Sequence, residues 1–167
     1  SYQKIYGFES FLDEVLIPLI GEIESLGRSE KIDLGTQTTC YNAIQDLMTF
    51  ILENTSSKMT KKKILICVPY GEQHTLGTKV IESQLLSKGN TVYNLSPFTP
   101  TSSIMESIEH NNPDCIFVSV TLDENILSAK RMIQKISDKY AIPIIVGGQA
   151  AKSDSENWNA SIGQNLP

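Results

Sequence analysis

His74 is the residue of this chain best suited to bind a transition metal. It is one of two histidines in 167 residues and follows an apolar, strand-like run, in the segment Gly71-Glu72-Gln73-His74-Thr75-Leu76-Gly77. Open α/β sheets hold their ligands in loops of this kind, at the carboxyl ends of the strands. A neutral imidazole is a good metal ligand, and the Glu72 carboxylate can hold its other ring nitrogen. The segment therefore indicates one axial position of a metal site, with a hydrogen-bonding loop histidine as the alternative.

Two further groups of small or polar residues end strand-like runs later in the chain. Ser119 and Thr121 end a run that begins at Cys115, and 41 residues separate Gly77 from Ser119. Gly147 and Gly148 close the next run, and 25 residues separate Thr121 from Gly147. Residues two apart on a strand point to the same side, which predicts that both hydroxyls face one way. The carboxyl ends of parallel strands share one edge of a sheet, so we expect all three motifs to meet there.

The spacing resembles the cobalamin-binding signature D-x-H-x-x-G, about 41 residues, S-x-L, about 25 to 28 residues and G-G. Glu72 stands where Asp is usual, and Thr121 stands where Leu is usual. Both variants resemble the sensor and regulator branch of the family. That branch includes light-responsive repressors of carotenoid genes and regulators of photosynthesis genes.

The resemblance implies a role for each residue of the three motifs. His74 would be the lower axial ligand of cobalt, replacing the cofactor's own dimethylbenzimidazole, with Glu72 bonded to its other ring nitrogen. Ser119 would bond the buried benzimidazole nitrogen, and the nucleotide tail would lie against glycine backbone. The predicted cofactor-binding set is Glu72, His74, Leu76, Gly77, Ser119, Thr121, Gly147 and Gly148, with His74 as the metal ligand.

The part of the chain that carries these motifs alternates short apolar runs with helical patterns. The expected elements span residues 64–68, 76–87, 91–95, 102–111, 115–120, 124–139 and 142–146. Such alternation predicts right-handed crossovers and a parallel, doubly wound sheet. We therefore expect an α/β, Rossmann-like domain with flavodoxin-like strand order over residues 63–167.

A short helical cap is predicted before this domain. Apolar residues recur at spacings of three and four over residues 8–26, and a second helix is expected over 38–54. Pro18 should kink the first helix, and Gly27 should end it. We interpret residues 1–57 as a truncated bundle and residues 58–62 as a linker.

The cap differs from that of the sensor branch, in which a Trp and a later Glu-His pair close over an adenosyl group. Glu24 stands at the Trp position, and Leu34-Gly35 falls where Glu-His would be. The resemblance therefore leaves the upper ligand open between adenosyl and smaller groups such as methyl, hydroxyl or water. A related sensor group uses the same scaffold for haem, which makes haem the alternative cofactor.

Composition limits the partners of this segment. The net charge of −5 argues against direct nucleic-acid contact, because no basic excess is present to bind phosphates. No run approaches the roughly 20 apolar residues of a membrane span. The three cysteines form no C-x-x-C pair, which favours reduced thiols in a cytoplasmic protein. Because the chain starts at Ser1 with a helical pattern close behind, we expect a DNA-binding domain or partner protein outside it.

These observations favour a cobalamin-binding sensory domain of a transcriptional regulator or photoreceptor. The sequence contains no evident nucleophile–base pair, so we do not expect an enzyme. The alternatives are a corrinoid carrier subunit of a methyltransferase, a haem-binding sensor, and a degenerate domain that mediates protein contacts without a cofactor.

Overall fold

A computed structural model describes residues 7–53, 61–97 and 99–153 of the chain. The chain divides into two compact units, residues 1–58 with 79–89 and residues 59–78 with 90–167. The predicted division did not anticipate that residues 79–89 group with the helical unit. Residues 58–60 of the predicted linker and residues 154–167 of the predicted second domain lie outside the described residues.

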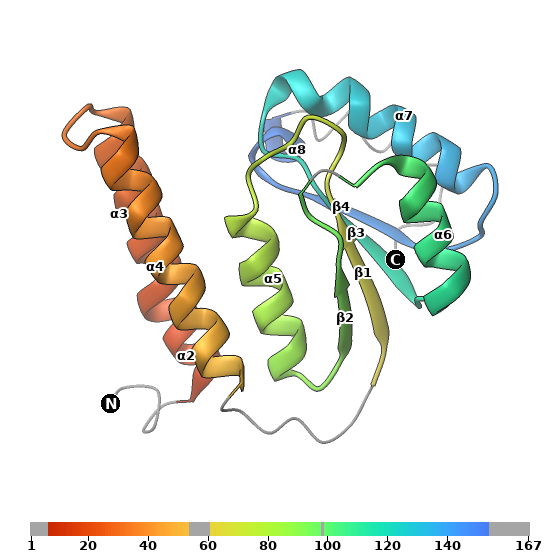
Figure 1. The fold of residues 1–167 in the computed structure, drawn as a ribbon, viewed down its shortest axis with the longest axis horizontal. Helices are drawn as coiled ribbons and strands as arrows, with labels where there is room; N and C mark the ends of the chain where they lie inside the picture. Colours follow the sequence, from red (N-terminus) through yellow and green to blue (C-terminus); the bar gives the residue numbers. More distant parts are fainter. Residues whose placement is uncertain (1–6, 54–60, 98, 154–167) are drawn as a thin grey trace. The chain divides into compact units, whose positions relative to one another are not determined.

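A parallel sheet of four strands forms the centre of the second unit (Figure 1). Its strands are β1 (Lys63–Cys67), β2 (Thr91–Asn94), β3 (Cys115–Ser119) and β4 (Ile144–Gly147), in the order β2-β1-β3-β4. This order and the parallel pairing confirm the predicted flavodoxin-like arrangement. In β1 only the first residue is exposed, as expected for a central parallel strand covered on both faces.

Two helices, α6 (Thr101–Asn111) and α7 (Ile126–Ser137), pack on this sheet. Leu65 and Cys67 of β1 and Ile116 and Val118 of β3 alternate along their strands and belong to one buried cluster. The helices contribute Ile104, Ile108, Ala129, Met132, Ile133 and Ile136 to the same cluster. A 3-10 turn, η2 (Asp123–Asn125), precedes α7, and α8 (Gln149–Ser153) follows β4. The core therefore holds the carboxyl ends of β1, β3 and β4 at fixed positions.

The helical unit contains α2 (Phe8–Phe11), a π-helical turn η1 (Leu12–Leu16), α3 (Ile17–Arg28) and α4 (Leu34–Glu53). It also contains most of α5 (Leu76–Ser87), which begins in the second unit. The first predicted helix is interrupted by the π turn, which ends just before Pro18. Proline lacks the N–H of a regular helix and is tolerated in a first turn, where Pro18 lies in α3.

Two predicted helix ends in this unit are wrong. Gly27 does not end the first helix, which continues to Arg28. A Cβ at Gly27 would lie 2.7 Å from Nε2 of Gln37, so this glycine allows α3 and α4 to approach closely. The second helix begins at Leu34 rather than residue 38, because Oδ1 of Asp33 accepts the backbone N–H of Thr36 at 3.0 Å and caps its start.

None of the described helices combines the length and apolar character required to cross a membrane.

Candidate functional site

The loop after β1 turns Glu72 into the interior of the α/β unit. Gly71 has a φ of +96°, a conformation that side chains rarely adopt, and the N–H of Glu72 donates to the Pro69 carbonyl at 3.1 Å. This tight turn leaves the Glu72 side chain with 0% exposure. Glu72 is therefore a buried acid rather than a solvated surface carboxylate.

Five N–H groups donate to the two oxygens of the buried Glu72 carboxylate. Oε1 accepts the backbone N–H of His74 at 3.1 Å and faces Nδ1 of the same residue at 2.7 Å. Oε2 accepts the backbone N–H groups of Thr121 at 2.9 Å and Leu122 at 3.2 Å, and Nδ2 of Asn125 at 3.0 Å. One carboxylate thus joins the loop after β1 to the loop after β3.

These hydrogen bonds keep Glu72 ionised. Burial alone would raise the pKa of the Glu72 carboxyl, because an apolar interior disfavours a charge. The hydrogen bonds from Asn125, His74 and Thr121 outweigh this effect, and the pKa is lowered from its ordinary value. The site therefore holds a fixed negative charge directly beside the His74 ring.

The His74 ring is oriented for metal ligation. An ionised carboxylate can only accept, so the Glu72 contact assigns the proton of a neutral imidazole to Nδ1 and leaves the lone pair on Nε2. The side chain is 55% exposed, and Nε2 has no polar partner among the described residues. His74 thus offers one nitrogen ligand, as an axial position of a macrocycle-held metal requires.

A hydroxyl lies beside two glycines at the sheet edge formed by the carboxyl ends of the strands. This edge, which also carries His74, is called the rim. Ser119 is 6% exposed, and within the described part of the chain its hydroxyl has no hydrogen-bond partner. A Cβ at Gly77 would lie 3.9 Å from this Oγ, and a Cβ at Gly147, which pairs with Ser119 across β3 and β4, would meet no atom within 4 Å. A buried, unsatisfied hydroxyl costs free energy unless a partner arrives. These residues fit the tail of a bound cobalamin.

Gly148 is needed for the backbone conformation at this position, whereas Gly147 borders open space. Its φ is +111°, and a Cβ there would overlap the carbonyl oxygen of Val120 and lie 2.7 Å from the carbonyl carbon. That carbonyl accepts the N–H of Ala150 at 3.2 Å. The two neighbouring glycines therefore differ: only Gly148 is required by the fold itself.

The remaining predicted residues lie at the same rim with more limited contacts. Strand β3 ends at Ser119, so Thr121 lies two residues beyond the strand that was expected to carry both hydroxyls. Thr121 instead contributes its backbone N–H to Glu72. Leu76 is the first residue of α5 and is half-buried.

Sequence reasoning missed the polar residues that brace these loops. Asn125 is 7% exposed and contacts Glu72, although it lies outside the motif positions. Thr78 is fully buried, and its Oγ1 donates to the Thr75 carbonyl at 2.7 Å and lies 2.8 Å from Oγ of Ser96. Ser96 in turn donates to Oδ1 of Asn94 at 2.6 Å. The only sequence signal for these residues was a polar side chain in a loop at the rim. Many surface positions have such a side chain, so the signal did not single these residues out.

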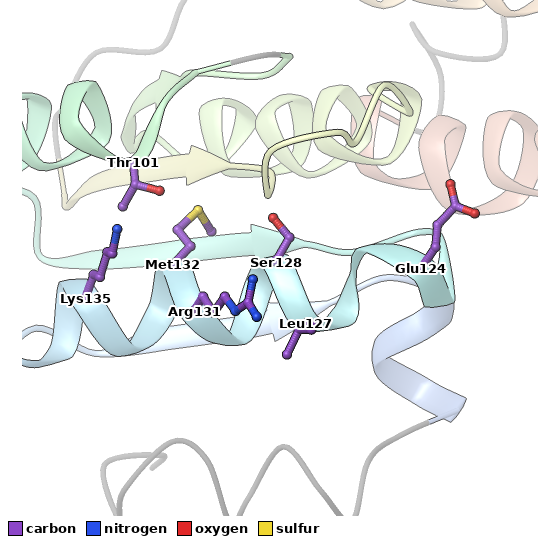
Figure 2. Close-up of a pocket in the computed structure, with 7 residues that line it drawn as sticks. All are labelled: Thr101, Glu124, Leu127, Ser128, Arg131, Met132 and Lys135. Carbon is purple, nitrogen blue, oxygen red and sulfur yellow. The ribbon is translucent and has the colours of Figure 1, made fainter.

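A separate cavity of about 320 Å³ lies along α7 (Figure 2). Its lining side chains come from η2 and α7, except for Thr101 at the start of α6: Thr101, Glu124, Leu127, Ser128, Arg131, Met132 and Lys135. None of the predicted cofactor-binding residues lines this cavity. It is therefore distinct from the rim that carries His74.

Among residues 7–53, 61–97 and 99–153, no group of three or more His, Cys, Asp or Glu side chains is arranged to hold a metal ion.

Proteins that resemble this chain in sequence or in structure include a corrinoid protein and a cobalamin-binding protein. The chain is 29% identical over 102 residues to the glutamate mutase sigma subunit of Fusobacterium nucleatum, covering 60% of this chain and 74% of that one. The monomethylamine corrinoid protein of Methanosarcina barkeri matches with a TM-score of 0.67, 16% identity and coverage of 86% and 69%. A cobalamin-binding protein of Desulfitobacterium hafniense DCB-2 matches with a TM-score of 0.57, 15% identity and coverage of 87% and 69%. At these identities the two structures show a common fold.

A family model also matches the chain. Residues 62–163 match the model of the B12 binding domain, and this range is more than half of the chain and includes every predicted site residue. The chain therefore belongs to the B12 binding domain family, and its α/β part is a cobalamin-binding domain.

Proposed function

We propose that His74 is the lower axial ligand of the cobalt of a cobalamin bound at the sheet rim. The observation that carries this proposal is the 2.7 Å contact between Nδ1 of His74 and the buried Glu72 carboxylate. That contact directs the lone pair of Nε2 outward from a half-exposed ring. When bound, the cofactor supplies a cobalt centre that carries an exchangeable upper ligand.

The same proposal assigns the tail of the cofactor to the second part of the rim. Ser119 would donate or accept the hydrogen bond that it lacks among the described residues. Gly77 and Gly147 would leave room beside it, because a side chain at Gly147 would project into otherwise open space. Leu76 and Thr121 border this region through α5 and the loop after β3.

We further propose that the domain is a corrinoid carrier without catalytic groups of its own, which serves a partner protein. The named relatives support this role: one is a subunit of a mutase and another is a corrinoid protein. One chain in the crystal structure of the methanol:cobalamin methyltransferase complex of Methanosarcina barkeri is also similar in fold to this chain, with a TM-score of 0.50 at 16% identity. A partner enzyme would then provide substrate binding and acid–base chemistry.

The second candidate is a sensory or regulatory domain, joined to a DNA-binding domain or partner elsewhere. Its support is the resemblance of the Glu72 and Thr121 variants to the sensor branch. The sequence of the cap argues against binding of an adenosyl group, because Glu24 stands at the Trp position and pairs with Arg28 at 3.7 Å. We therefore propose a smaller upper ligand such as methyl for this chain.

Ultraviolet–visible titration of the purified chain with hydroxo-, methyl- and adenosylcobalamin and with haem tests these proposals. His74→Ala is the site variant, and His110→Ala is the matched control, since His110 is an exposed residue at the end of α6. A cobalamin spectrum altered by His74→Ala alone would support axial ligation. Binding of haem alone would contradict it. With adenosylcobalamin, a change of oligomeric state on illumination would favour the sensor, and its absence together with tight methylcobalamin binding would favour the carrier.

A further inference from the structure

The cavity along α7 contains none of the residues assigned to cobalamin (Figure 2). Its volume of about 320 Å³ falls within the range of small-molecule pockets in proteins. Met132 belongs to the buried cluster of the α/β unit and is 3% exposed, whereas Leu127 is 58% exposed. Part of the lining is therefore apolar and accessible from solvent.

Two cations of α7 line the same cavity. Arg131 and Lys135 are four residues apart, so their side chains project from one face of the helix, where like charges repel each other. Neither side chain has an ion pair or a hydrogen bond among residues 7–53, 61–97 and 99–153. Guanidinium and ammonium groups donate several hydrogen bonds each and accept none. Two positive charges and their donors are therefore available to a ligand.

The start of α6 brings a hydroxyl group to these cations. Thr101 is the first residue of α6, and Figure 2 shows the ammonium group of Lys135 pointing toward it. The hydroxyl of Thr101 has no hydrogen-bond partner in the described part of the chain. An ammonium group, a guanidinium group and a hydroxyl thus line one cavity, and together they favour a negatively charged ligand.

Glu124 restricts the charge of that ligand at the other end of the cavity. Figure 2 shows its carboxylate at the opposite end of the lining from Lys135. A carboxylate there repels a second anionic group, so the negative charge of the ligand has to lie near the two cations. Ser128 lies between the two ends, and its hydroxyl already donates to the Tyr70 carbonyl at 3.1 Å.

We propose that this cavity binds a phosphate monoester that has an apolar organic part. The phosphate group would lie between Arg131, Lys135 and Thr101. The organic part would lie against Met132 and Leu127. A phosphate monoester carries about −1.5 to −2 charges at neutral pH and has three strong acceptor oxygens, which matches two cations and a hydroxyl. The inference goes beyond the proposed function and does not rest on it.

Calorimetric titration of the full, cofactor-free chain tests the proposal with three probes: phenyl phosphate, inorganic phosphate and benzoate. A chloride buffer of low ionic strength limits the screening of exposed charges. Phenyl phosphate should bind most tightly, because it alone has both a phosphate group and an apolar ring. Benzoate should bind more weakly, because it has one charge and two acceptor oxygens.

The variants separate the two parts of the ligand. Arg131→Gln and Lys135→Gln should each weaken phenyl phosphate binding about tenfold, because each removes charged hydrogen bonds. Both residues are exposed, so both variants should fold as wild type does. Leu127→Ala should weaken the binding of phenyl phosphate and leave that of inorganic phosphate unchanged. Lys62→Gln is the matched control, since Lys62 is an exposed cation outside the cavity, and it should match wild type.

Four results would overturn the proposal. The first is that phenyl phosphate gives no binding heat, and the second is that benzoate binds as tightly as phenyl phosphate. The third is an equal loss of affinity in Lys62→Gln and Arg131→Gln, which would show general attraction to surface charge. The fourth is competition by hydroxocobalamin, which would assign the cavity to the cofactor. Failure of the chain to bind any cobalamin would reject the proposed function and leave this inference intact.

Discussion

Replacement of Glu72 by glutamine keeps the shape of a buried side chain but removes its charge and one acceptor. Five N–H groups face the two carboxylate oxygens, and a glutamine can offer them a single oxygen. The oxygen should turn to the side with three donors, from Thr121, Leu122 and Asn125. The glutamine NH₂ group would then face the backbone N–H and the ring of His74.

This arrangement has separate consequences for stability and for cobalt binding. Leaving the His74 backbone N–H unpaired costs about 1–3 kcal/mol, and replacing a charged by a neutral acceptor weakens the other three bonds by about 1 kcal/mol each at most. We expect a total loss of about 1–6 kcal/mol. The ring would accept at Nδ1 and carry its proton on Nε2, where it blocks the metal. The cobalamin affinity should therefore fall about 10- to 100-fold, as for other lost partners of metal ligands.

Urea denaturation of the cofactor-free chain measures the stability, and spectroscopic titration with hydroxocobalamin measures the affinity. Glu109→Gln is the matched control, because this exposed carboxylate faces Lys139 at 2.6 Å and Tyr140 at 2.7 Å, away from the rim. It should leave the affinity unchanged. Wild-type stability together with wild-type affinity in Glu72→Gln would refute the argument that the carboxylate fixes the imidazole.

Three further predictions follow from the rim and the core. Denaturation should show that Gly148→Ala loses at least about 1–3 kcal/mol of stability, because the φ of Gly148 is +111° and an added Cβ overlaps Val120. Gly147→Ala should keep the stability of wild type and lose cobalamin affinity in titration, because its Cβ would enter open space at the rim. Ser119→Ala should leave the cofactor-free chain as stable or more stable by up to about 1 kcal/mol, yet weaken cobalamin binding about fivefold; a destabilised cofactor-free variant would contradict the unsatisfied hydroxyl. Burial raises the pKa of Cys67 from its ordinary 9.0 to about 12, so its contribution to stability is present below pH 9 and is lost as the pH rises toward 12. Denaturation at increasing pH should show this loss in wild type and a flatter profile in Cys67→Ala.

The α/β fold was predictable because its signals are local and repeated. Continuous β-branched runs predicted β1 and β4 within one or two residues, and turn residues separated them from helical patterns. A parallel order with right-handed crossovers then leaves few topologies. The same local logic missed the π turn before Pro18 and the start of α4, which Asp33 caps.

The location of the candidate residues in the fold was predictable, but their contacts were not. The spacing of the motifs brought His74, Ser119 and Gly147 to one rim, and the register of β3 with β4 places the last two side by side. Burial of Glu72 and its link to Asn125 could not be read from the sequence, because they depend on how two loops meet in space.

Electron paramagnetic resonance of the chain loaded with cob(II)alamin shows whether the His74 nitrogen binds cobalt. Two preparations are compared, one with unlabelled histidine and one with histidine that carries the heavier nitrogen isotope. If His74 is the ligand, the nitrogen splitting changes from a triplet to a doublet on labelling, and His110→Ala leaves this change intact while His74→Ala abolishes it. A triplet that persists in the labelled protein would show that the cofactor's own benzimidazole binds the cobalt, and would exclude His74 as the ligand.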